Sequence, residues 1–544
     1  MHKILIVSIA LIMGIMATLQ GQDTTKKQSI NINSSYKPVL RNAVKINLMG
    51  SQMQVDTTKL KLVYSIPSQN LFYTYNPISL KPLALEQDTN LYLGNRRYLK
   101  LGYGNFSTPY INGGVSFGDG KVSILNVTGN YIQQKGNIKN QEYSLANLKM
   151  AGSYFLPKNE LYGGIEANQH TYHLYGYNHT LFNFKKDSVQ QQFRQVTLRA
   201  GIKNTQPTET GINYNPSIEL NLFTHKNAAN ETNAIINLPL AKVVNSHFMA
   251  EVALIADFTK YSTLKLIPAN IKLNNTLVQI KPAINYYSSY FKIHGGFTAA
   301  WDNKKYQLLP DIYAEIPIEG KIFSLQAGWI GRFVKNSYRN LVAINPYQSP
   351  ITAQVNTKET EYYGGIKASI AKHFNFSAKA GLINYKNLPF FINDTLKNDK
   401  VFVIANEVSV NNFRVHADFS YINQDKFMLT GAVNFNGYTS MKSNARAWHT
   451  IPVELVGSLR WWAFKTILLK SDVRFFDGSN YLAKGNIARP LGGGTDVSAG
   501  IEIKLNKKVS IWGDANNILN NTYERWHNYE VYGANFLGGI LLNF

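Results

Sequence analysis

The feature that most constrains this chain is a strict two-residue alternation of apolar and polar side chains. From Val497 to Leu505, every second residue is apolar, and Ser498, Gly500, Glu502 and Lys504 lie between them. Residues 98–103 and 251–258 show the same period. Because successive side chains of a strand point to opposite faces, the pattern predicts strands with one apolar wall and one wetter wall.

These alternating segments recur from Arg97 to Phe544 and are separated by turn-rich links. A tilted strand crosses the hydrocarbon of a bilayer with about 9–11 residues. We therefore expect an all-β fold in residues 95–544: a large transmembrane antiparallel β-barrel of about 20–22 strands. Lys335 to Thr357 and Asp477 to Thr495 are long links, as outer loops would be, whereas periplasmic turns are short. A soluble propeller is the alternative, but it requires a repeat of about 40–50 residues, which is not found.

The C-terminus also alternates, and it ends on an aromatic residue. Phe536, Gly538, Ile540, Leu542 and Phe544 occupy every second position up to the last residue. This pattern indicates a final strand that the barrel-assembly machinery recognises and that then pairs with the first strand.

Composition excludes several classes of protein. The chain has no cysteine, which excludes a disulfide scaffold, thiolate metal sites and cysteine nucleophiles. It carries 56 Lys and Arg against 33 Asp and Glu, a formal net charge of +23, but the positive charges are scattered singly. Scattered charge favours a polar interior or rim over a nucleic-acid partner.

The N-terminus predicts export. Lys3 precedes an apolar run from Ile4 to Ala17 that is too short to span a bilayer, so residues 1–22 are interpreted as a signal peptide. Residues 23–94 follow without periodicity and contain spaced prolines, which deny ladder hydrogen bonds. We expect a periplasmic or lumenal strap there, and an outer-membrane location for the whole protein.

Charged residues at alternating positions are candidates for the barrel lumen. They are Lys100, Glu251, Asp257, Asp472, Arg474, Glu502 and Lys504. An interior rich in lysine would attract anionic solutes, but we expect most of these charges to pair with one another. Asp472 and Arg474 lie two residues apart on one face, and we expect an ion pair between them.

The sequence shows no convincing catalytic, cofactor or metal site. His170, His173 and His179 are close in sequence and could ligate a metal, but residues three apart on a strand face opposite sides. Gly492–Gly494 lacks the Lys-Ser/Thr that a phosphate-binding loop needs, and no nucleophile elbow has plausible partners. We therefore expect a protein that is not an enzyme.

The C-terminal segments Trp512–Glu524 and Tyr532–Ile540 resemble the last hairpin of TonB-dependent outer-membrane receptors. Tyr362–Lys367 and Leu388–Phe391 are similar to barrel hairpins of that family. The richness in Asn, Tyr and Lys resembles members from the Bacteroidota. The resemblance implies a large outer-membrane barrel. The chain also departs from the family in one respect. Members of the family carry a plug domain and a TonB-contacting box ahead of the barrel, and residues 23–94 match neither.

Two functions remain open from the sequence. A barrel of this width without a plug would leave a wide aqueous hole, so either the strap or a partner must fill it. This favours a subunit of an outer-membrane complex for assembly, secretion or export of surface proteins, beside a partner barrel or a surface lipoprotein. The alternative is a porin-like channel, or partner-gated uptake of solutes. Outer-membrane lipids and the barrel-assembly machinery are expected partners in both cases.

Overall fold

The computed structural model describes residues 97–264, 270–318, 322–370, 373–423 and 426–544. The predicted signal peptide (1–22) and strap (23–94) lie outside the described residues. Within the described ranges, no helix is long and apolar enough to cross a membrane.

Strands dominate the described residues. In chain order they are β1 (Arg97–Gly104), β2 (Thr108–Gly118), β3 (Ser123–Lys135), β4 (Glu142–Phe155), β5 (Asn159–His173), β6 (Gln190–Asn204), β7 (Ile212–Tyr214), β8 (Ser217–His225), β9 (Ala229–Val243), β10 (Phe248–Thr263), β11 (Lys272–Tyr287), β12 (Lys292–Asp302), β13 (Lys305–Ile318), β14 (Phe323–Val334), β15 (Thr357–Ile370), β16 (Phe374–Asn393), β17 (Phe402–Asn423), β18 (Phe427–Thr439), β19 (Val453–Phe464), β20 (Ile467–Phe476), β21 (Asn480–Ala483), β22 (Ile487–Pro490), β23 (Gly494–Lys504), β24 (Val509–Asn516), β25 (Glu524–Trp526), β26 (Tyr529–Glu530) and β27 (Asn535–Asn543). The helices are η2 (Lys186–Val189), α2 (Tyr338–Ile344) and η3 (Thr395–Lys397).

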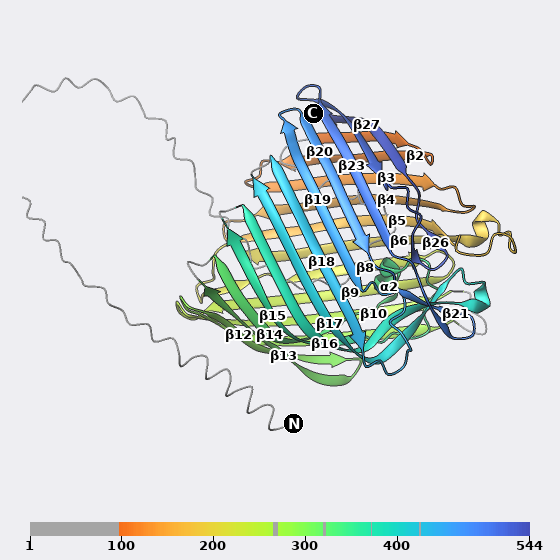
Figure 1. Cartoon of the computed structure of the whole chain (residues 1–544). Helices are drawn as coiled ribbons and strands as arrows, with labels where there is room; N and C mark the ends of the chain where they lie inside the picture. Colours follow the sequence, from red (N-terminus) through yellow and green to blue (C-terminus); the bar gives the residue numbers. More distant parts are fainter. Residues whose placement is uncertain (1–96, 265–269, 319–321, 371–372, 424–425) are drawn as a thin grey trace, which may run out of the picture. The chain divides into compact units, whose positions relative to one another are not determined.

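The long strands form one closed antiparallel barrel of 22 strands, which confirms the predicted fold (Figure 1). Each long strand pairs with the next long strand along the chain, so that β6 pairs with β8, β20 with β23 and β24 with β27, and β27 pairs with β1 to close the ring. Tyr98 opposes Asn543 and Gly104 opposes Leu537 at this seam. The backbones approach closely here, because a Cβ on Gly539 would lie 1.8 Å from the carbonyl oxygen of Leu101. The short β7 is an extra strand beside β9, and β21–β22 and β25–β26 are separate hairpins.

The barrel wall has an apolar outer face and a polar inner face. On β8, Leu220 and Leu222 are exposed, whereas the intervening Asn221 is buried. On β9, Glu231 and Asn233 are buried on the inner face. This arrangement reverses that of a soluble protein and is the one required of a wall with lipid on its outer side.

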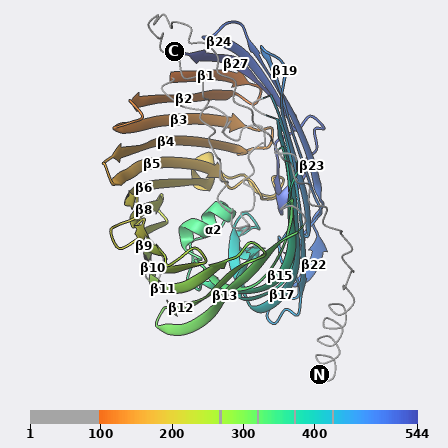
Figure 2. The same cartoon turned by 90° about the vertical axis from the view of Figure 1, so that its left-hand side faces the viewer.

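The two ends of the barrel differ in the length of their connections. One end, the short-turn end, has brief links such as residues 156–158 and 465–466. The other, the long-loop end, carries residues 174–189, 335–356, 440–452, 477–493 and 517–534. The two long links expected from the sequence are therefore confirmed. Residues 335–356, called here the inner loop, contain α2, and Figure 2 shows α2 inside the ring of strands.

Candidate functional site

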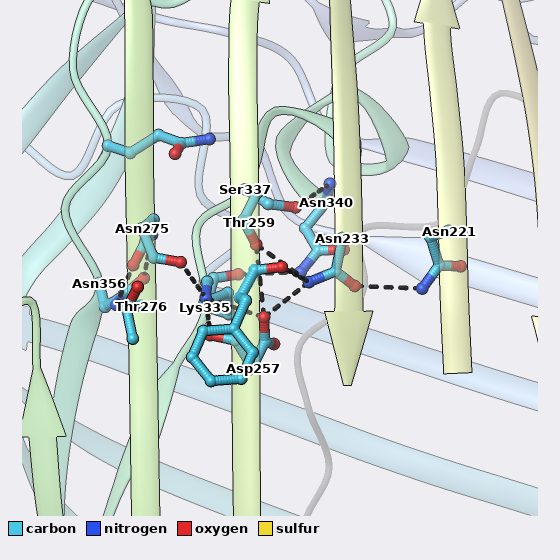
Figure 3. Close-up of polar contacts among 12 residues, drawn as sticks. Asn221, Asn233, Asp257, Thr259, Asn275, Thr276, Lys335, Ser337, Asn340 and Asn356 are labelled. Atoms are coloured by element: carbon cyan, nitrogen blue, oxygen red, sulfur yellow. Dashed lines mark hydrogen bonds and ion pairs between the residues drawn. The ribbon is translucent and has the colours of Figure 1, made fainter. Parts of the chain in front are cut away.

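The inner loop begins at Lys335, which anchors it to the barrel wall (Figure 3). Its ammonium group donates to the carboxylate of Asp257 at 2.8 Å, the carbonyl oxygen of Asp257 at 3.0 Å and that of Asn275 at 2.8 Å. The three donors of the lysine are thus all used. The side chains of Lys335 and Asp257 are only 9% and 14% exposed. Burial lowers the pKa of Lys335, and the Asp257 carboxylate opposes that shift.

A row of amide and hydroxyl side chains extends this anchor across three strands. Asn221 donates to Asn233 at 3.1 Å, and Asn233 donates to Asp257 at 2.6 Å and to Thr259 at 2.9 Å. The register explains the row, because Asn221 opposes Asn233 and Asn233 opposes Thr259 on the inner face. The anchor of Lys335 is therefore held in place by neighbours that are themselves hydrogen-bonded.

The far end of the inner loop is fixed to the same wall. Asn356 exchanges two side-chain hydrogen bonds with Asn275, of 2.8 and 2.9 Å, and donates to Asp302 at 2.7 Å. Asn336 donates to the hydroxyl of Thr357 at 2.8 Å, and so ties the start of the loop to its end. A loop held at both ends by buried polar contacts is a fixed part of the interior.

Helix α2 lies between these two anchors. Ser337 caps it by accepting from the backbone N–H of Asn340 at 3.3 Å, and the Glu231 carboxylate accepts from that of Tyr338 at 2.7 Å. Tyr338 is fully buried, and its hydroxyl lies within hydrogen-bond distance of Nδ1 of His225, at 2.7 Å. Carboxylate and hydroxyl caps satisfy N–H groups that the first helical turn leaves unpaired.

Beyond α2, the inner loop packs against other long loops in one apolar group, which we call the loop cluster. Its members include Tyr175, Tyr338, Tyr347, Phe402, Trp526 and Tyr529. The rings of Tyr347 and Tyr529 stack with centroids 3.7 Å apart, and Tyr529 is fully buried. Chain segments nearly two hundred residues apart are thus joined by aromatic packing, which contributes more than their buried area alone.

The charged residues predicted for the lumen all lie on the inner face. Lys100 contacts the Trp512 ring at 4.0 Å and Asp514 at 4.0 Å. Glu502 is buried, and Lys504 lies 3.7 Å from the Trp462 ring. On β10, Glu251 and Asp257 share the face of the buried Thr259, and Asp257 is the carboxylate that pairs with Lys335.

The prediction of an ion pair between Asp472 and Arg474 is wrong. Asp472 instead pairs with Arg460 at 3.0 Å, and Arg474 pairs with Glu454 at 2.8 Å. Residues two apart on one strand are separated by about 7 Å, whereas long side chains reach diagonal partners on the neighbouring strand readily. The alternation identified the face correctly, but the register selected the partners.

The predicted final strand is β27, between β24 and β1. Its alternating residues Phe536 and Ile540 are exposed on the outer face, with Gly538 and Leu542 at intervening positions of that face, and Phe544 is exposed beyond the strand end. The role of these residues in assembly stays a prediction.

Sequence reasoning missed the anchoring of the inner loop. The only available signal was the polar residues at alternating positions of β8, β9 and β10, which include Asn221, Asn233 and Thr259. Within the described residues, no group of three or more His, Asp or Glu side chains is placed to hold a metal ion.

Comparison with known proteins identifies the fold through structure alone. No protein-family model and no curated protein sequence matches this chain. The iron transporter FrpB from Neisseria meningitidis has a TM-score of 0.64 and 9% identity, over 82% of this chain and 81% of that one. The siderophore receptor PirA from Acinetobacter baumannii has a TM-score of 0.63 and 8% identity, over 82% and 80%.

The ferric-catecholate import receptor Fiu from E. coli K12 has a TM-score of 0.62 and 10% identity, over 83% of this chain and 82% of that one. The names of these similar structures describe a transporter and receptors rather than enzymes. At this level of identity, the likeness concerns the fold. The described barrel has the fold of TonB-dependent outer-membrane receptors.

Proposed function

We propose that this protein is a transport barrel of the outer membrane whose lumen is narrowed at the long-loop end by the inner loop. The observation that carries the proposal is the fixed position of that loop inside a barrel with a polar inner face and an apolar outer face. A polar wall conducts hydrated solutes, and a fixed internal loop sets the size of what passes. The fold, shared with an iron transporter and siderophore receptors, supports the same class of function.

The test is the conductance of the purified full chain in planar bilayers. We compare the wild type with a variant that lacks residues 338–352 and with Lys335→Met, which removes the anchor. We expect a small or closed conductance for the wild type and a larger, fluctuating one for both variants. Lys484→Met, a change of an exposed lysine in the β21–β22 hairpin, is the matched control and should leave conductance unchanged.

A barrel that conducts in none of these forms contradicts the transport proposal. A pull-down from outer membranes in mild detergent then decides what replaces it. A partner barrel or surface lipoprotein that co-purifies in equal amount would support the other function considered from the sequence, a subunit of an outer-membrane complex.

A further inference from the structure

Two pairs of lysines lie on the outer face of the barrel near the long-loop end. Lys358 on β15 and Lys386 on β16 are directly opposite in the register. Lys260 on β10 opposes Asn274, two residues from Lys272 on β11, so these two lysines are diagonal neighbours. Glu359 and Tyr385, adjacent in sequence to the first pair, are buried on the inner face, so Lys358 and Lys386 point outward.

These four lysines have no carboxylate partner among the described residues. The ion pairs that the described residues of β15 and β16 form are on the inner face, and they join Lys367 to Glu315, Lys379 and Arg414 to Glu361, and Arg332 to Glu359. Like charges directly opposite each other destabilise a sheet. An anion bound from outside the barrel wall would therefore stabilise the Lys358–Lys386 pair.

The depth of the pair in the membrane follows from the aromatic residues beside it. Tyr362, four residues from Lys358 on the same face, stacks on Trp329 with ring centroids 5.5 Å apart. Both rings are exposed on the outer face. Because Trp and Tyr settle at the membrane–water interface, this stack marks the border of the hydrocarbon. The lysines lie about 13 Å further along the tilted strands, at the level of lipid headgroups.

From the lysines toward the middle of the membrane, the outer face is first polar and then apolar. Between the lysines and the aromatic row, Asn384 donates to Asn411 at 2.8 Å on the outer face, beside Thr360. Below them is a hollow of about 660 Å³, lined by Trp329, Tyr362, Leu382, Phe413 and small residues that include Gly364. The order of charge, amide, aromatic ring and apolar hollow matches that of a lipid from headgroup to acyl chain.

We propose that Lys358 and Lys386 bind the phosphate of an anionic lipid headgroup in the leaflet at the long-loop end. Its acyl chain lies over the row of Tyr362, Leu382 and Phe413 and in the hollow below. Residues directly opposite on two antiparallel strands have Cβ atoms about 5 Å apart, so the two lysines can present six N–H donors to one phosphate, which offsets their mutual repulsion. Lys260 and Lys272 form a second, more open site of the same kind.

The experiment measures lipid retained by the purified full chain after delipidation, by native mass spectrometry. Phosphatidylglycerol and phosphatidylcholine are offered in separate mixed micelles. We expect the wild type to retain phosphatidylglycerol roughly tenfold more than phosphatidylcholine, because paired lysines attract an anionic headgroup. Lys358→Gln/Lys386→Gln should lose most of this preference, and Lys358→Arg/Lys386→Arg should keep it.

The matched control is Lys135→Gln. Lys135 is also an outer-face lysine at the long-loop end, but it already lies 4.0 Å from the Glu142 carboxylate, so its loss should leave retention unchanged. Equal retention of the two lipids by the wild type overturns the proposal, as does full retention by the double Gln variant. Displacement of phosphatidylglycerol by millimolar inorganic phosphate would show a site for soluble anions and would also overturn it.

A measurement on the wild type alone keeps the proposal testable even if the variants misfold. The preference of the wild type for phosphatidylglycerol should fall as salt rises, because Lys386 is exposed and Lys358 is only partly buried, and salt screens such charges. A salt-independent preference contradicts binding through these charges. The result stands apart from the transport proposal, because conductance and lipid retention are measured separately.

Discussion

The two ends of the barrel interior use the same residue types in opposite surroundings. At the long-loop end, Lys335 of the inner loop and Asp257 of β10 are nearly buried, with side chains 9% and 14% exposed. At the short-turn end, Lys203 pairs with Glu160 at 2.8 Å, but the lysine side chain is 44% exposed. The two ion pairs have the same length. Their surroundings, rather than their geometry, decide how much each ion pair contributes to the free energy of unfolding.

The interior of the barrel has a packed core only where the long loops fold over the inner wall. A strand wall alone leaves inward side chains hydrated, as the exposed Lys203 and Arg199 show. The long loops supply a second layer that excludes water and forms the loop cluster. A buried polar group that loses its partner costs free energy, whereas a hydrated group can pair with water instead. Substitutions at the long-loop end should therefore cost more stability than substitutions at the short-turn end.

Lys335→Met should have the largest effect, because it leaves the Asp257 carboxylate buried without its partner. Loss of one member of a buried ion pair costs about 3–5 kcal/mol. We expect faster hydrogen exchange in residues 338–352 while the barrel strands stay protected. The double variant Lys335→Met/Asp257→Leu should recover part of that protection, and no recovery would contradict a charge-based anchor.

Tyr529→Ala removes a fully buried ring from the centre of the loop cluster. Truncation of a buried aromatic side chain costs about 3 kcal/mol or more. Because Tyr529 stacks on Tyr347, the inner loop and residues 517–534 should both become sensitive to protease. Tyr290→Ala, a change of an exposed tyrosine in the short turn 288–291, is the control, and equal sensitivity of the two variants would argue against a long-loop core.

His449 makes the packing of the long loops depend on pH. Burial lowers its pKa to about 3, its Nδ1 meets the carbonyl oxygen of Phe391 at 2.8 Å, and Arg525 nearby disfavours a second positive charge. The folded loop keeps this ring neutral, whereas the unfolded loop takes up a proton below about pH 6.5. Stability is therefore complete above pH 6.5 and falls as the pH falls toward 3, by about 2 kcal/mol at pH 5.

The measurement is hydrogen exchange in residues 440–452 at pH 7 and pH 5, corrected for the intrinsic rate. His449→Gln should remove most of the pH-dependent loss of protection. His247→Gln, in the short turn 244–247, should not change it. An identical pH response of the wild type and His449→Gln would rule out this histidine as the cause.

Lys203→Gln should have the smallest effect. The pair with Glu160 is solvated, and exposed ion pairs contribute less than about 1 kcal/mol. Thermal unfolding of the barrel should be nearly unchanged at low and high salt. A loss as large as that of Lys335→Met would remove the distinction between the two ends.

Local pattern predicted the wall but not the contacts across it. The inner-face positions of Asp472, Arg474 and Glu502 follow from the two-residue period alone, because a strand has only two sides. The partners of Asp472 and Arg474 were assigned incorrectly, since the register between β19 and β20 decides which diagonal neighbours meet. The anchor of the inner loop left almost no sequence signal, because Lys335 and Asp257 are 78 residues apart.

The order of residues along the chain is enough to predict the strands, the apolar outer face and polar inner face, the long links and the final strand. Each of these depends on the order of neighbouring side chains, which an extended backbone translates directly into position. Local pattern could not predict the exact number of 22 strands, the partner of each inner charge, the folding of residues 335–356 into the lumen or the alignment of Lys358 with Lys386. These depend on register and ring closure, which bring together residues far apart in the chain.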